Sequence, residues 1–164
     1  INSKCRVNTA NTIVNDGTIK SLLYGGSQGY SYTGTVNLTI NGGDMKNCYV
    51  TAGGSNGYTG NCNVKINGGS IYLYQSVNRG YVENVNVKFN SGSIDKFYIG
   101  GETEDSTVTG TINAFTTNLV GGNTGTLNAG TSNASVISID NNYYTVTSIF
   151  FKYIKRDHLH HYFL

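Results

Sequence analysis

The sequence predicts an all-β fold, a single-stranded parallel β-solenoid (β-helix) of about five coils of 23–26 residues, closed by a C-terminal hairpin or cap. One observation is a short unit that recurs with its glycine at Gly17, Gly43, Gly69 and Gly92, which are 26, 26 and 23 residues apart. The other is strict alternation of apolar and polar residues before these glycines. Alternation with period two indicates strands that bury one face.

The division of the chain follows this repeat. We expect residues 1–13 to form an N-terminal cap or lead-in, residues 14–130 the solenoid repeats, and residues 131–148 a capping hairpin. Residues 149–164 differ from the rest in charge, aromatic content and histidine content. We interpret them as a cap, a contact with another chain, or sequence foreign to the protein.

The stretch before each repeat glycine is expected to be a strand whose alternate residues face the core. The expected inward residues are Val36, Leu38 and Ile40, then Cys62, Val64 and Ile66, then Val85, Val87 and Phe89. Cys62 shares its repeat position with valines, which favours a small buried apolar role over a redox or ligand role. The chain has three cysteines without CxxC spacing, so neither a zinc site nor a fully paired disulfide framework is indicated.

A corner follows each of these strands. Asn15, Asn41, Asn67 and Asn90 occupy the same place in the unit, so stacked coils would align their amides into an internal ladder. The glycines two residues later would permit positive φ at the corner. We interpret these residues as structural.

A second short apolar stretch follows each corner, so each coil holds two or three short strands. A fifth, degenerate coil is expected over residues 107–127. Residues 136–139 and 143–146 are expected to pair as the capping hairpin, because an open coil end is an unpaired edge.

Composition limits the function. Charged residues are 12% of the chain, and its net charge of +2 comes entirely from residues 152–157. A neutral body argues against electrostatic capture of nucleic acid or of an acidic membrane. No apolar run approaches the ~20 residues that span a bilayer, and no motif indicates a cofactor.

Tyrosine provides the best candidate binding residues. Four tyrosines recur within one residue of the same repeat position, and two more lie a few residues further on. These are Tyr24, Tyr49, Tyr74 and Tyr98, followed by Tyr58 and Tyr81. A row of rings beside amides and hydroxyls suits a polysaccharide or a protein contact, because rings give contact area at low entropic cost. The alternative is a tyrosine stack that only stabilises the coil.

The evidence for catalysis or metal binding is weak. Glu102, Glu104 and Asp105 are weak candidates for a calcium site or for glycosidase carboxylates, although acids clustered in a loop are usually a solvated turn. Three other aspartates, at positions 16, 44 and 95, occupy different repeat positions. All histidines lie at positions 158–161, so no Ser-His-Asp arrangement is available, and we expect no enzymatic activity.

The pattern Gly-x-Val-x-Leu-x-Ile-Asn-Gly-Gly at residues 34–43, with related copies at 60–69 and 83–92, precedes a Tyr- and Gly-rich half. It resembles the glycine- and asparagine-rich parallel β-solenoid repeats of bacterial cell-surface adhesins and phage tail-fibre proteins. The resemblance covers about residues 14–127. It implies an extracellular, cell-surface or virion-surface location and an adhesive or structural role.

We therefore expect a non-catalytic, adhesin-like or structural module that binds a surface glycan or a protein receptor. One alternative is a subunit of a filament or fibre that self-assembles through coil ends or through the tail. Another is a solenoid polysaccharide hydrolase or lyase. An ice-binding solenoid is disfavoured because the threonines form no regular row.

Overall fold

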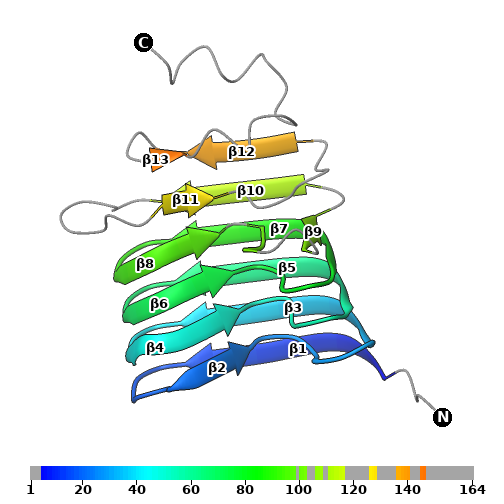
Figure 1. Ribbon diagram of the computed structural model, residues 1–164, viewed down its shortest axis with the longest axis horizontal. Helices are drawn as coiled ribbons and strands as arrows, with labels where there is room; N and C mark the ends of the chain where they lie inside the picture. The colour runs from blue at the N-terminus through cyan, green and yellow to red at the C-terminus, as the bar shows by residue number, and fades with distance from the viewer. Residues whose placement is uncertain are drawn as a thin grey trace.

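The computed structural model describes residues 5–98, 100–102, 106–108, 111–116, 126–128, 136–140 and 145–146. Within these residues the protein is all-β, without a helix, and its parallel strands stack as a β-solenoid (Figure 1). This confirms the predicted fold class. In the described part of the chain, no helix is long and apolar enough to cross a membrane.

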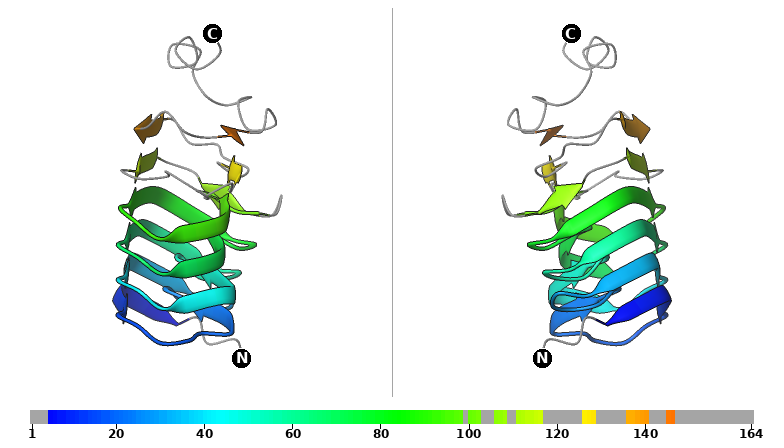
Figure 2. Two further views of the ribbon diagram at one scale, coloured as in Figure 1. Left: turned by 90° about the vertical axis from the view of Figure 1, so that its left-hand side faces the viewer. Right: turned by 90° about the vertical axis from the view of Figure 1, so that its right-hand side faces the viewer.

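The strands form two sheets that face each other across the core (Figure 2). The long-strand sheet consists of β1 (Arg6–Val14), β3 (Tyr32–Ile40), β5 (Tyr58–Ile66), β7 (Tyr81–Phe89), β10 (Thr111–Thr116) and β12 (Val136–Asp140), with β9 (Thr107–Val108) paired to β7. The short-strand sheet consists of β2 (Ser21–Tyr24), β4 (Asp44–Thr51), β6 (Ser70–Gln75), β8 (Ser93–Tyr98), β11 (Thr126–Asn128) and β13 (Thr145–Val146). Each coil therefore contributes one strand to each sheet.

The ends of the solenoid differ from the expectation. Strand β1 begins at Arg6, so the coils already start within the expected lead-in. Four coils lie in residues 5–98, and two further pairs of strands continue the sheets, so the number of coils differs slightly from five. Strands β12 and β13 pair in parallel with β10 and β11, respectively, and belong to different sheets. The expected hairpin of residues 136–139 and 143–146 is therefore wrong, because alternation identifies a strand but not its partner.

The core is built from the alternate residues that the sequence analysis assigned to it. Cys62, Val64 and Ile66 of β5 are at most 4% exposed, and their counterparts in β3 and β7 are buried as well. The aromatic rings of Phe89 and Phe97 pack together from opposite sheets, with centroids 6.2 Å apart. Apolar burial between the sheets is the main stabilising contribution expected for such a fold.

Register is constant across the long-strand sheet and variable across the short-strand sheet. Partners in β3 and β5 are 26 residues apart at every position, and those in β5 and β7 are 23 residues apart. In the short-strand sheet, the register between β4 and β6 shifts between Met45 and Tyr49. Part of the contraction of the third interval therefore occurs in the short-strand sheet.

The corner glycines adopt the conformation that the sequence predicted. Gly17, Gly43, Gly69 and Gly92 have φ between +92° and +109°. Stacking adds a second constraint, since a Cβ atom on Gly92 would lie 2.6 Å from the carbonyl oxygen of Gly69 in the coil below. Glycine is thus required here both by the backbone conformation and by the close approach of coils.

Candidate ligand-binding groove on the long-strand sheet

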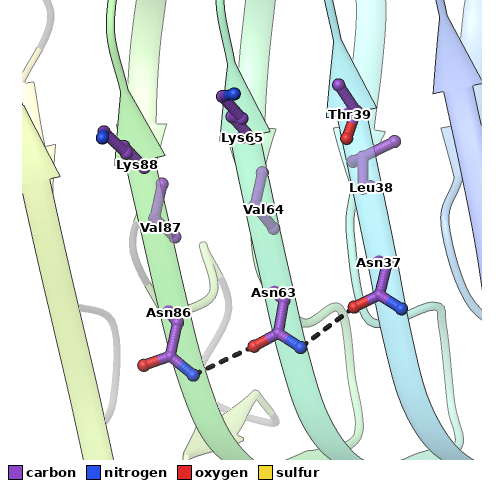
Figure 3. Close-up of a pocket in the computed structure, with 9 residues that line it drawn as sticks. All are labelled: Asn37, Leu38, Thr39, Asn63, Val64, Lys65, Asn86, Val87 and Lys88. Atoms are coloured by element: carbon purple, nitrogen blue, oxygen red, sulfur yellow. Dashed lines mark hydrogen bonds between the residues drawn. The ribbon is translucent and has the colours of Figure 1, made fainter.

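The outward face of strands β3, β5 and β7 carries a groove of about 240 Å³ (Figure 3). Its lining consists of three equivalent residues from each strand. These are Asn37, Leu38 and Thr39, then Asn63, Val64 and Lys65, then Asn86, Val87 and Lys88.

Strand alternation builds this groove. The middle residue of each triplet points into the core and is at most 4% exposed, so the strand backbone forms the floor. The first and third residues of each triplet point outward and form two sides. Because the register is constant, equivalent side chains lie directly above one another along the stack.

Asparagine amides form one side of the groove. Asn37 Nδ2 donates to Asn11 Oδ1 at 2.8 Å, Asn63 Nδ2 to Asn37 Oδ1 at 3.0 Å, and Asn86 Nδ2 to Asn63 Oδ1 at 3.1 Å. We call these four residues the groove ladder. The sequence analysis did not anticipate it, although each member directly follows an inward residue of the repeat: Val36, Cys62 or Val85 in the last three.

The asparagines at the corner also form a ladder, the one that the sequence analysis expected. Asn41 donates to Asn15 at 2.8 Å, Asn67 to Asn41 at 2.7 Å, and Asn90 to Asn67 at 2.7 Å. This corner ladder ends the long strands, and its amides are engaged along the stack. It supports the structural interpretation of these residues.

The other side of the groove is formed by Thr39, Lys65 and Lys88, which are in register. Both lysines are exposed. Like charges on neighbouring strands destabilise a sheet. The groove therefore combines a row of amides with a pair of adjacent positive charges.

An amide offers two N–H donors and two acceptor lone pairs. In the groove ladder, Asn63 uses one donor and one acceptor position for its neighbours. The remaining positions suit hydroxyl groups, which both donate and accept. The arrangement can therefore hold a polyhydroxylated ligand without breaking the ladder.

The four tyrosines expected at one repeat position do not form a row. Tyr49 points outward and is 40% exposed, whereas Tyr74 points into the core and is fully buried. Tyr74 packs edge-on against Phe97, with ring centroids 5.1 Å apart. Tyr24 and Tyr98 share a third position along the stack, with two non-aromatic residues between them.

The register shift in β4 explains this correction. It lies between Met45 and Tyr49, so residues after it are displaced relative to β6. Tyr49 is in register with Leu73, and Tyr74 is in register with Val50. A displacement of one residue turns a side chain to the opposite face of a strand.

A real column of rings lies near the start of the long strands. Tyr32, Tyr58 and Tyr81 are in register, and the sequence analysis named the last two but missed Tyr32. Each lies four residues before an inward residue of the repeat, which is the signal that identifies them. The guanidinium of Arg6 lies 4.7 Å from the Tyr32 ring centroid and ends the column.

The geometry of this column favours stabilisation over binding. The rings of Tyr32 and Tyr58 stack with centroids 5.2 Å apart and planes at 9°, so they cover each other's faces. Tyr58 Oη donates to Glu83 Oε2 at 3.0 Å. Partial burial, followed by this hydrogen bond, raises the pKa of Tyr58. Tyr81 remains 55% exposed and is the member most open to a partner.

The acidic candidates gain no support as a site. Glu102 is exposed, and its backbone N–H donates to Gln75 Oε1 at 3.1 Å. Glu104 and Asp105 lie outside the described residues, as does the tail at 149–164 with its histidines. Within the described ranges, no group of three His, Cys, Asp or Glu residues can hold a metal ion.

The cysteines fit a packing role. Cys62 is in register with Val36 and Val85 and fully buried, which confirms the sequence prediction. Burial raises the pKa of Cys62 to about 12, so its thiol stays protonated and unreactive near neutral pH. Burial also raises the pKa of Cys48, while Cys5 is exposed.

Comparison with known proteins gives no relative, since no protein-family model, curated protein sequence or solved structure matches this chain. The fold alone defines its class. It is a parallel β-solenoid repeat protein whose long-strand sheet presents a groove lined by amides and lysines.

Proposed function

We propose that this chain is a non-catalytic, adhesin-like module of an extracellular, cell-surface or virion-surface protein, and that it binds an extended surface glycan. The observation that carries this proposal is the groove, which repeats the same outward polar positions on three successive strands. The ligand lies along the solenoid axis, across the strands.

Two physical features support a glycan as the ligand. The amides of the groove ladder repeat at the strand spacing of ~4.8 Å, which is comparable with the length of one sugar residue in an extended chain. The backbone floor is flat because its side chains point into the core. A linear chain of hydroxylated rings can therefore meet equivalent amides at successive coils.

The test is a glycan array probed with the purified chain, with release of reducing sugars assayed in parallel. Thr39→Tyr places a bulky ring in the groove, whereas Thr35→Tyr makes the same change elsewhere on the outward side of β3. We expect Thr39→Tyr to weaken glycan binding at least tenfold and Thr35→Tyr to leave it unchanged. Thermal melts of both variants confirm that they fold.

Three results would overturn the proposal. One is that the wild-type chain binds no glycan, including when only a protein receptor is captured. Another is that the two tyrosine variants bind as well as each other. Release of sugar by the wild-type chain would contradict the non-catalytic role.

A further inference from the structure

The lysine pair of the groove has a consequence for the charge of the ligand. Lys65 and Lys88 are direct partners on β5 and β7, both exposed, at a strand spacing of ~4.8 Å. Two ammonium groups held this close repel each other. An anion between them would convert this repulsion into two attractive contacts.

The face that surrounds this pair does not supply such an anion. The neighbouring outward positions on β5 and β7 are the amides of the two ladders, and Thr39 precedes the pair in its own row. Among β1, β3, β5 and β7, the one acidic residue is Glu83. It lies five residues before Lys88, or ~16 Å along an extended strand, and it accepts the Tyr58 hydroxyl.

Other acidic residues are placed elsewhere. Asp44 and Asp95 belong to β4 and β8 of the short-strand sheet, and Asp16 follows β1 at the bottom corner of the stack. Screening at physiological salt has a length of about 8 Å, so a carboxylate across the core does little for exposed lysines. The groove is therefore locally positive on a chain body that is close to neutral.

We infer that the ligand of the groove is an anionic glycan, with its acidic groups against Lys65 and Lys88 and its hydroxyls against the groove ladder. This inference rests on the proposed function and specifies its ligand class. Lysine acts as a point charge without a fixed fork, so it accepts a carboxylate or a sulfate on a sugar. Neutral glycans gain only the amide contacts.

The experiment compares matched pairs of polymers by biolayer interferometry on the full chain. Polygalacturonate is compared with its methyl ester, which removes the charge and keeps the sugar, and dextran sulfate is compared with dextran. We expect binding at least tenfold tighter for the charged member of at least one pair, and weaker binding at 200 mM than at 50 mM NaCl. The two pairs distinguish carboxylate from sulfate.

Variants locate the effect. Lys65→Gln combined with Lys88→Gln should abolish the preference for the charged polymer. Lys20→Gln combined with Lys46→Gln removes the same charge at exposed sites before and within the short-strand sheet, and should preserve it.

The outcomes separate the inference from the proposed function. Equal binding of charged and neutral polymers would overturn the anionic ligand and leave glycan binding intact. A preference that survives Lys65→Gln and Lys88→Gln, or that disappears equally in the control pair, would overturn the assignment to this groove. Failure to bind any polymer, here and on the array, would overturn both.

Discussion

Removing one amide from the middle of the groove ladder tests whether the ladder stabilises the stack. Asn63 takes part in two side-chain hydrogen bonds, to Asn37 and from Asn86. Asn61 lies two residues earlier on the same strand and takes part in one, from Asn84. Asn63→Ala and Asn61→Ala are therefore matched substitutions that differ in the number of hydrogen bonds lost.

The expected magnitudes follow from these counts. An intramolecular hydrogen bond contributes about 0.5–1.5 kcal/mol net, so we expect Asn63→Ala to cost about 2 kcal/mol. Asn61 is exposed whereas Asn63 is half-buried, so we expect Asn61→Ala to cost less than about 1 kcal/mol. For a chain of this size, the loss at Asn63 corresponds to a Tm lowered by about 4–8 °C.

Guanidinium titrations followed by far-UV circular dichroism measure both losses, and equal m-values for the variants check that the transitions are comparable. Adding Asn37→Ala to the Asn63→Ala background then measures the coupling between neighbours in a double-mutant cycle. A loss at Asn63 no larger than that at Asn61, or no coupling to Asn37, would refute the reasoning that the amides act as a ladder.

Two further predictions concern glycine and cysteine. Gly92→Ala and Gly17→Ala both impose positive φ on alanine, at about 1–2 kcal/mol, but the added Cβ meets the Gly69 oxygen at 2.6 Å in the first and nothing within 4 Å in the second. Gly92→Ala should therefore lower the unfolding free energy more, and equal losses in denaturant titrations would contradict the close approach. For Cys62, the folded pKa of about 12 exceeds the ordinary value of 9.0, so its contribution is complete below pH 9 and is lost as the pH rises toward 12. At pH 10 the loss is about 1.4 kcal/mol, and Cys62→Val should show a smaller fall in stability between pH 8 and pH 10 than the wild type; identical falls would count against a buried neutral thiol.

The long-strand sheet and the corners were predictable because their residues repeat at constant register. Alternation identified the inward residues, such as Val64 and Ile66, and the shared place of Asn41 and Asn67 in the unit identified the corner ladder. Sequence spacing and spatial register agree wherever no residue is inserted between stacked strands.

The short-strand sheet was less predictable because its strands differ in length. Tyr49 and Tyr74 are 25 residues apart, which suggested one row, but the register shift in β4 places them on opposite faces. Local residue types do not identify such a shift in advance. By contrast, Tyr32 and the groove ladder were missed although each member keeps a constant distance from an inward residue of the long strand.

The division between a constant and a variable sheet makes the groove independent of coil length. Coils that differ by three residues present their amides and lysines on one straight line, because the extra residues lie outside the long strands. Duplication of either a 26-residue or a 23-residue unit would therefore lengthen the groove by one equivalent step. The reach of the protein along a polymer can grow by whole coils, while insertions and deletions accumulate on the opposite side.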